Sequence, residues 1–137
     1  MENYQSNSEQ ETKLIAEKLA KETKSHIFAL FGELGAGKTI FVQGFAKGVG
    51  IKDKIISPTF VLIRQHKIPG TTKVLYHIDL YRLENTTNLK ELGLEEIWSN
   101  PGNYVLIEWA EKISELPKNA IRISIQKQGD NRLITLS

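Results

Sequence analysis

The chain has 137 residues, which suits one domain, and its 40% hydrophobic and 25% charged residues are ordinary for a soluble globular protein. A net charge of +2 is too small to predict direct binding to nucleic acid, and the lack of cysteine excludes disulfides and thiolate metal sites. The amino terminus lacks the basic start and apolar core of a signal peptide, and no apolar run approaches membrane-spanning length. We therefore expect a single cytosolic domain over residues 1–137 that binds neither membrane nor DNA.

The first third of the chain predicts a helix, a buried strand and a second helix. A capping box at residues 8–11 starts an amphipathic helix that should end near Thr23. The apolar run 26–31 is typical of a buried parallel strand. Beyond Lys38, apolar residues recur at helical spacing, and the glycines at 48 and 50 offer a stop.

Between this strand and this helix, residues 32–39 read Gly-Glu-Leu-Gly-Ala-Gly-Lys-Thr and fit the phosphate-loop pattern G-x-x-x-x-G-K-[ST]. The glycines let the backbone turn tightly and present N–H groups to a phosphate. Lys38 can reach the β- and γ-phosphate oxygens, and the Thr39 hydroxyl can ligate Mg²⁺. Because the motif has the strand before it and the helix after it that its function needs, we interpret it as a nucleotide site and not as a chance glycine-rich turn. The expected nucleotide contacts are Glu33, Leu34, Gly35, Ala36, Gly37, Lys38 and Thr39.

Two strand-like runs, 60–66 and 73–79, follow with only a short loop containing Pro69-Gly70 between them. Such a loop predicts a hairpin, so the two strands should be antiparallel. In a hairpin the start of the first strand lies beside the end of the second. Thr59 and Asp79 should therefore be neighbours at one rim of the sheet.

The remaining pattern predicts a short helix over 85–93, a second helical piece over 94–98, a strand over 104–108, and a terminal hairpin formed by 120–127 and 132–136. Strands and helices alternate around the phosphate loop. The expected fold is α/β, a P-loop NTPase three-layer fold whose mixed sheet has parallel core strands and antiparallel hairpins.

A phosphate-loop enzyme needs a second acid at a strand end to hold Mg²⁺. Asp79 and Glu108 each end a hydrophobic strand, where a buried charge makes sense only beside a cation or a hydrogen-bond donor. Ligands of open α/β sheets bind at the carboxyl ends of the parallel strands, where both acids should lie. The residues alone leave open which acid holds the metal and which orients water.

Other polar and aromatic residues near these strand ends allow more than one interpretation. His77 lies on the same face of its strand as Asp79, and a packed or hydrogen-bonding histidine is favoured over a metal ligand. Arg82 could stabilise γ-phosphate charge or form a structural ion pair. Trp109 could pack on a nucleotide or a partner, although a core position is favoured. Residues 57–59 could form a γ-phosphate-sensing switch or a simple turn.

The class of nucleotide protein is narrowed by what the motifs lack. There is no Asn-Lys-x-Asp segment to read guanine, and Asp79 is followed by Leu-Tyr-Arg instead of a D-x-x-G switch. An arginine-rich lid of a small-molecule kinase is not evident beyond Asp79. An ATPase remains as the first hypothesis, with a non-hydrolysing nucleotide-gated adaptor and a phosphate-loop kinase as alternatives.

Four motifs together resemble the bacterial TsaE (YjeE) family in their order and spacing, over nearly the whole chain. They are the phosphate loop 32–39, Ser-Pro-Thr-Phe at 57–60, His-Ile-Asp-Leu-Tyr-Arg-Leu at 77–83 and Ile-Glu-Trp at 107–109. The resemblance implies an ATPase that helps to form threonylcarbamoyladenosine at position 37 of tRNA. It also implies binding to the TsaD–TsaB pair, through which the protein reaches tRNA indirectly and which its ATP hydrolysis resets.

The resemblance also assigns roles to individual residues. It implies that Thr39 and Glu108 bind Mg²⁺. Asp79 then becomes the acid that supports hydrolysis, together with Lys38. The segment 57–59 resembles a switch loop in which Thr59 acts near the γ-phosphate. The entry to the first helix, near Glu9, is expected to touch ATP.

Overall fold

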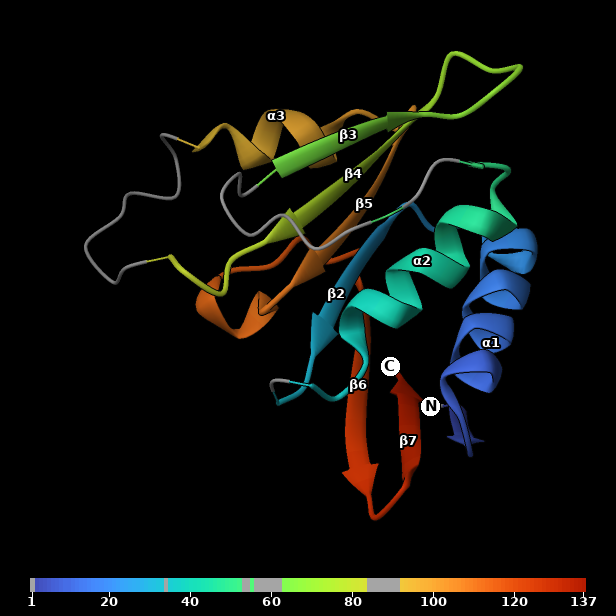
Figure 1. Ribbon diagram of the computed structural model, residues 1–137. Coiled ribbons are helices and arrows are strands. Elements are labelled where there is room, and N and C mark those ends of the chain that lie inside the picture. Colours follow the sequence, from blue (N-terminus) through green and yellow to red (C-terminus); the bar gives the residue numbers. More distant parts are fainter. Residues whose placement is uncertain (1, 34, 53–54, 56–62, 84–91) are drawn as a thin grey trace.

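The structure is a computed structural model that describes residues 2–33, 35–52, 55, 63–83 and 92–137. The chain combines strands and helices, and two pairs of strands follow one another directly, as Figure 1 shows. In order they are β1 (Glu2–Ser6), α1 (Glu9–Glu22), β2 (Ile27–Phe31), α2 (Lys38–Gly48), β3 (Ile63–Lys67), β4 (Val74–Asp79), α3 (Leu94–Ser99), β5 (Asn103–Glu108), the 3₁₀ turn η2 (Ala110–Lys112), β6 (Ile121–Gln128) and β7 (Asn131–Leu136).

Within the described ranges, the strands form one sheet in the order β1-β7-β6-β2-β5-β4-β3. The central strand β2 runs parallel to both β5 and β6, and β4 runs parallel to β5. The outer pairs β3–β4, β6–β7 and β1–β7 are antiparallel. This arrangement confirms the predicted α/β fold with parallel core strands and antiparallel hairpins.

The two predicted hairpins are both confirmed where the structure describes them. In the first, Ile63 lies opposite Ile78, and in the second, Ser124 lies opposite Thr135. The predicted neighbourhood of Thr59 and Asp79 and the predicted helix over 85–93 rest mainly on residues outside the described ranges. The helical piece expected at 94–98 is present as α3.

Strand β1 was not predicted. Its residues are mostly polar and exposed, with only Ser6 buried, so no hydrophobic alternation marks it as a strand. It pairs antiparallel with β7 and covers the edge of that strand, and the register places Glu2 opposite Leu136 and Ser6 opposite Arg132. A buried hydrogen bond of 2.7 Å between the hydroxyls of Ser6 and Thr12 then ties β1 to α1.

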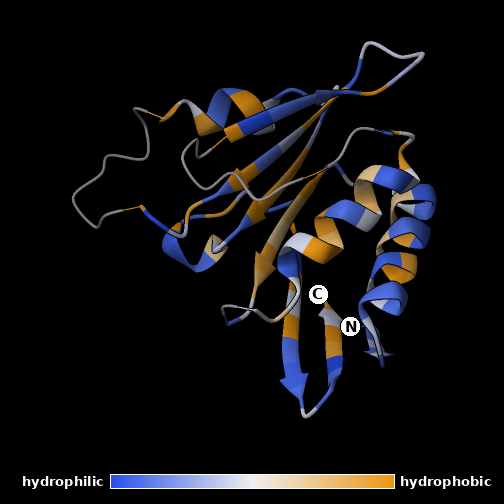
Figure 2. Cartoon of the chain, in the orientation of Figure 1, coloured by the Kyte–Doolittle hydropathy of each residue, from blue (hydrophilic) through white to orange (hydrophobic). Residues whose placement is uncertain are grey.

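The sheet carries a layer of helices on each face. Helices α1 and α2 lie side by side on one face, and α3 and η2 lie on the other (Figure 1). The first face buries a large apolar cluster built around Phe28, Phe41 and Phe45, and the second buries a smaller one built around Ile78 and Ile107. The central strands are hydrophobic over most of their length, whereas the tip of the β6–β7 hairpin is hydrophilic (Figure 2). No described helix has both the length and the apolar character that a membrane crossing requires.

Helices α1 and α2 approach each other through glycines. A Cβ atom at Gly44 would lie 2.3 Å from the carbonyl oxygen of Lys13, and one at Gly48 would lie 2.6 Å from that of Glu17. Glycine is therefore required here for backbone contact, although it is a poor helix former. The close contact holds α2, and with it the phosphate loop, against the rest of the domain.

We expect Gly44→Ala to destabilise the protein even though alanine raises helix propensity by about 1 kcal/mol. The added methyl group meets backbone atoms of Lys13, which cannot rotate away, so the free energy of unfolding should fall by about 1–3 kcal/mol. Urea unfolding followed by circular dichroism measures the change. The control Lys47→Ala alters an exposed residue of the same helix and should stay within about 0.5 kcal/mol of the wild type. Equal stability of Gly44→Ala and the wild type would contradict the tight packing.

Candidate active site

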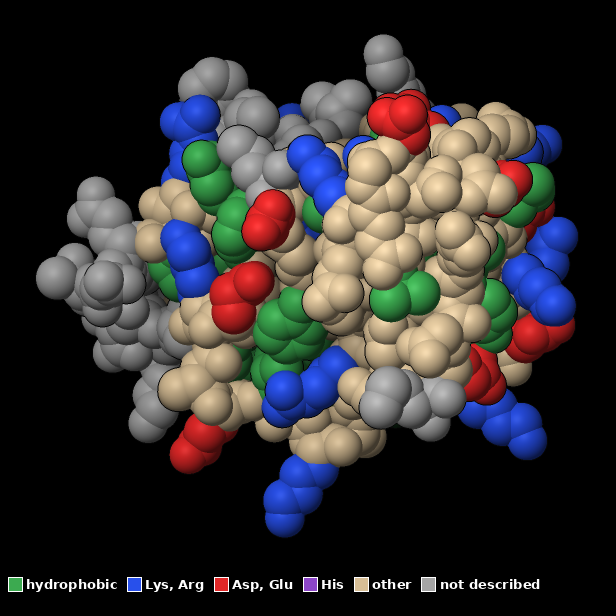
Figure 3. Space-filling view, turned by 90° about the horizontal axis from the view of Figure 1, so that it is seen from below, with side chains coloured by type: hydrophobic (Ala, Val, Ile, Leu, Met, Phe, Trp, Pro, Cys, Tyr) green, Lys and Arg blue, Asp and Glu red, His purple; other side chains and the backbone are tan. Residues whose placement is uncertain are grey.

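The carboxyl ends of β2, β4, β5 and β6 meet at one edge of the sheet because these four strands are parallel. At this edge Asp79, the last residue of β4, lies directly opposite Glu108, the last residue of β5. Seen from this edge, a small group of hydrophobic side chains lies among acidic and basic ones (Figure 3). A pocket of about 460 Å³ opens here, which we call the main pocket.

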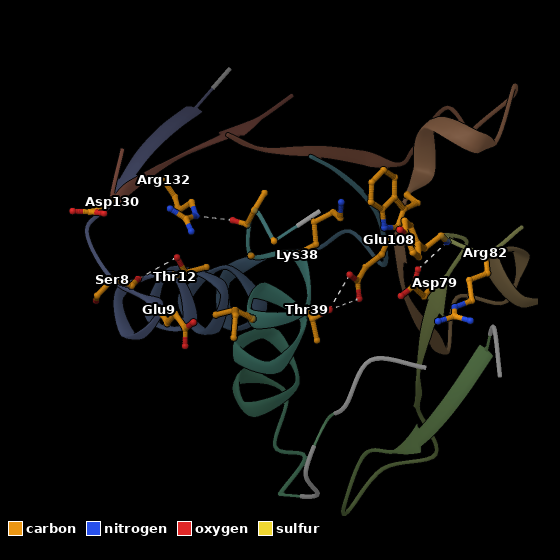
Figure 4. Close-up of a pocket in the computed structure, with 16 residues that line it drawn as sticks. Ser8, Glu9, Thr12, Lys38, Thr39, Asp79, Arg82, Glu108, Asp130 and Arg132 are labelled. Atoms are coloured by element: carbon orange, nitrogen blue, oxygen red, sulfur yellow. Dashed lines mark hydrogen bonds between the residues drawn. The ribbon is translucent and has the colours of Figure 1, made fainter. Parts of the chain in front are cut away.

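The main pocket extends from the start of α1 to the end of β5. Ser8, Glu9, Asp130 and Arg132 lie at one end, and Asp79, Arg82 and Glu108 at the other, with Lys38 and Thr39 between them (Figure 4). Its remaining lining residues are Thr12, Gly35, Ala36, Gly37, Ile40, Tyr81 and Trp109.

The phosphate loop delivers the amino end of α2 to the pocket. Gly37 precedes the helix with a φ of 113°, a left-handed conformation that glycine adopts without strain, and as a glycine it has no side chain to cap the helix. The first N–H groups of α2, like those of any α-helix, have no intrahelical acceptor, and the helix dipole adds positive potential at the same place. This end of α2 is suited to bind phosphate oxygens.

Three residues from three elements form a hydrogen-bonded chain beside the loop. The Thr39 hydroxyl of α2 lies 2.9 Å and 3.1 Å from the two carboxylate oxygens of Glu108, to which it donates. His77 of β4 donates from Nε2 to Oε2 of the same carboxylate. His77 is fully buried and Glu108 is 3% exposed. The prediction of a hydrogen-bonding His77 is confirmed.

Lys38 is held inside the site. Its ammonium group donates to the carbonyl oxygens of Gly32 and Glu33 and lies 3.6 Å from the centroid of the Trp109 ring. Only 4% of the residue is exposed. Burial lowers the pKa of this ammonium below the ordinary 10.5, and the negative charge of three nearby carboxylates opposes the shift.

Trp109 forms a wall of the main pocket. Its φ of 60° is left-handed, which is rare for a residue with a side chain and indicates local strain of about 1–3 kcal/mol. This turn ends β5 and directs the indole toward Lys38 and toward Tyr81, whose ring centroid lies 5.1 Å away. Trp109 also packs against the smaller core cluster, as the favoured prediction of a core position expects. It lines the main pocket as well, which that prediction did not include.

Asp79 is fixed by the backbone that follows it. Its Oδ1 accepts a hydrogen bond of 2.9 Å from the N–H of Tyr81, and the residue is 8% exposed. This hydrogen bond fixes the orientation of the Asp79 carboxylate at the strand end, beside Glu108. Two acids with different partners thus occupy adjacent positions, one bound to Thr39 and the other to a turn.

The far end of the pocket is braced by Arg132, which sequence reasoning missed. Its Nε donates a hydrogen bond of 2.9 Å to the carbonyl oxygen of Ala36 in the phosphate loop. The hairpin containing Asp130 and Arg132 was predicted, but its position depends on the strand order. Because β6 is parallel to β2, the turn after β6 reaches the same edge as the phosphate loop. Thr12, whose only sequence signal is its place in the first turn of a capped helix, was missed as well.

The donor set fits a nucleotide with Mg²⁺. A hydroxyl and a carboxylate that already lie within hydrogen-bond distance supply the hard oxygen ligands that Mg²⁺ prefers, and leave positions for water and phosphate. The cationic groups of Lys38, Arg82 and Arg132 and the amino end of α2 line the same pocket and suit a polyphosphate.

Comparison with known proteins identifies the family. The family model described as threonylcarbamoyl adenosine biosynthesis protein TsaE matches residues 6–134. The chain belongs to the TsaE family. TsaE of Bacillus subtilis strain 168, named a tRNA threonylcarbamoyladenosine biosynthesis protein, is 41% identical over 124 residues, which cover 89% of this chain and 75% of the relative. The protein of the same name from Rickettsia bellii is 43% identical over 129 residues, which cover 92% and 87%.

A solved structure agrees with this assignment. The crystal structure of YdiB from Bacillus subtilis superposes with a TM-score of 0.80 at 36% sequence identity, over 98% of this chain and 83% of that one. The predicted resemblance to TsaE is therefore confirmed, and the chain is a threonylcarbamoyladenosine biosynthesis protein of this family.

The main pocket gathers most of the predicted site residues. Glu33 is the exception: it is exposed and lines a neighbouring cavity, so its contact with a nucleotide stays a prediction. Leu34 and Thr59, with the rest of the segment 57–59, lie outside the described residues. The predicted site residues that do line the pocket are Glu9, Gly35, Ala36, Gly37, Lys38, Thr39, Asp79 and Glu108.

The buried ammonium of Lys38 predicts a pH dependence of stability. Its pKa is lowered in the folded protein, so between that value and 10.5 the unfolded chain binds more protons than the folded one. The free energy of unfolding should therefore rise with pH across this window, and Lys38→Met should remove that part of the rise. Urea unfolding of both proteins between neutral pH and about pH 10.5 measures the difference. Parallel profiles would show that Lys38 is not desolvated.

Proposed function

We propose that this TsaE protein is an ATPase that binds Mg-ATP in the main pocket and hydrolyses it slowly alone and faster with the TsaD–TsaB complex. Hydrolysis then resets that complex between rounds of threonylcarbamoyladenosine formation at position 37 of tRNA. The protein would reach tRNA only through its partners. The pathway follows from the family, whereas the ATPase activity and the partners are the proposal.

The observation that carries the proposal is the contact between Thr39 and Glu108. A phosphate-loop threonine and a strand-end carboxylate joined at 2.9 Å are the pair needed to hold Mg²⁺ against a nucleotide. Bound there, Mg²⁺ would neutralise charge on the phosphate oxygens. Glu108 thus supplies the metal ligand and leaves Asp79 for another task, which supports the division of labour implied by the resemblance.

The chain's own groups perform the remaining work by position and charge. The amino end of α2 and the Lys38 ammonium bind the phosphates and stabilise the negative charge that gathers during transfer. Asp79 can accept a hydrogen bond from water and orient it, because the turn at Tyr81 fixes its carboxylate. Little covalent chemistry is required of the protein, so positioning supplies most of the rate.

We expect slow ATP hydrolysis without partners because neither arginine of the pocket is held in place to contact the γ-phosphate. Arg132 already donates to the backbone of the phosphate loop, and Arg82 lies exposed at the rim after Asp79. An exposed side chain is not held against the γ-phosphate, so the charge-stabilising contact would have to be organised or supplied by a partner. In other phosphate-loop enzymes such completion raises the rate by roughly 10³–10⁵.

The decisive experiment is phosphate release from ATP by the purified protein with Mg²⁺, with and without the TsaD–TsaB complex and substrate tRNA. We expect weak turnover alone, marked stimulation by the complex, and loss of both in Lys38→Ala. Tight ATP binding without phosphate release under any condition would replace the ATPase with a nucleotide-gated adaptor. Transfer of labelled γ-phosphate to an acceptor other than water would identify a kinase.

Asp79→Asn should separate binding from hydrolysis. Asparagine keeps an oxygen for the Tyr81 N–H but loses the charge that orients water, so the fold and ATP affinity should be retained while turnover falls about 10²-fold or more. Calorimetric ATP binding and partner-stimulated phosphate release measure the two effects. Loss of ATP affinity equal to the loss of turnover would instead assign Asp79 to nucleotide binding.

A further inference from the structure

His77 is a buried polar residue for which the proposed mechanism has no task. It belongs to β4, two residues before Asp79, and alternation along the strand places both side chains on the sheet face covered by α2. Its ring is fully buried, and in the neighbouring strand Leu106 lies opposite it. Burying a histidine in the sheet costs desolvation, which only a specific partner offsets.

That partner is Glu108, and the geometry fixes which nitrogen carries the proton. A carboxylate is an acceptor, so Nε2 must donate to Oε2. Nδ1 is buried and has no hydrogen-bond partner among the residues that the structure describes. A proton on Nδ1 would be an unsatisfied buried donor, so the tautomer with hydrogen on Nε2 is the one that fits.

The two oxygens of Glu108 therefore have different surroundings. Oε2 receives the hydrogen bond from His77, while Oε1 is the nearer acceptor of the Thr39 hydroxyl at 2.9 Å. With one oxygen hydrogen-bonded to a buried ring on β4, the carboxylate loses rotational freedom. Its other oxygen then faces the threonine of the phosphate loop.

We propose that His77 is a positioning residue that orients the Glu108 carboxylate for Mg²⁺ through its Nε2–H. This inference rests on the proposed binding of Mg-ATP and adds to it the group that prepares the metal ligand. Hydrogen bonds from outer residues to metal-ligating groups fix ligand orientation, and their loss typically lowers metal affinity about 10–100-fold.

The tautomer can be tested in the protein without nucleotide. Two-bond ¹H–¹⁵N correlation spectra of the full chain, assigned by comparison with His77→Gln, should show Nε2 protonated and Nδ1 bare. His26, half-buried with its Nε2 near the Trp98 carbonyl oxygen, gives an internal reference far from the pocket. A His77 ring protonated on Nδ1 alone would overturn the proposal, because Nε2 could not then donate to Glu108.

A matched pair of variants tests the consequence for metal. Glutamine places an amide donor near the position of Nε2, whereas asparagine places it near Nδ1, away from Glu108. Calorimetry with a non-hydrolysable ATP analogue is carried out in Mg²⁺ and in EDTA. In Mg²⁺, the affinity of His77→Asn for the ATP analogue should be about 10–100-fold lower than that of the wild type, whereas in EDTA the two should differ little. His77→Gln should stay close to the wild type in both. The control His26→Asn should leave both affinities unchanged.

The outcomes separate this inference from the proposed function. If Mg²⁺ does not strengthen binding to the wild type, the proposed Mg-ATP site itself fails. If Mg²⁺ strengthens wild-type binding but His77→Asn behaves like the wild type, only the role of His77 fails. Equal losses in Mg²⁺ and EDTA, in step with a lower Tm, would show a purely structural histidine. Should His77→Asn not fold, the tautomer still decides, because an Nε2 without a proton would overturn the proposal.

Discussion

The parallel pairing of β2 with both β5 and β6 is the constraint on which the candidate site depends. It brings the carboxyl ends of these strands, and of β4 beside β5, to a single edge of the sheet. The phosphate loop leaves from the end of β2, so the acid of β5 lies on one side of it and the β6–β7 turn on the other. Had β5 been antiparallel, Glu108 would lie at the opposite edge from Thr39. The hydrogen bond between these two residues is thus a consequence of strand direction.

The helices then set the position of the phosphate loop at this edge of the sheet. Gly44 and Gly48 let α2 approach the backbone of α1, and the hydroxyl pair of Ser6 and Thr12 ties α1 to β1. These contacts link the phosphate loop to the far end of the pocket, where Glu9 lies. A rigid connection matters because phosphate-loop catalysis relies on placement, for which small displacements are costly.

Local patterns were sufficient to predict most of the fold and the centre of the site. The phosphate loop, the strand ends at Asp79 and Glu108, and both hairpins follow from hydrophobic runs, glycines and short loops, which act over a few residues. Strand β1 was missed because it is held by pairing with β7 and not by a buried face. Arg132 was missed because its contact with Ala36 joins residues 96 positions apart, which only the strand order brings together.

Lys38 shows how one residue can serve both the resting fold and the proposed chemistry. Its ammonium already donates to two loop carbonyl oxygens and lies against the ring of Trp109, whose own backbone is left-handed. A bound phosphate that draws this ammonium away must replace those contacts. The net contribution of Lys38 to substrate binding is therefore smaller than the strength of its contact with the phosphate. In the proposed reaction the same ammonium can interact more strongly as negative charge develops on the oxygens of the leaving phosphate. Such a balance favours the transition state over tight binding of the substrate, which is the condition for rate acceleration.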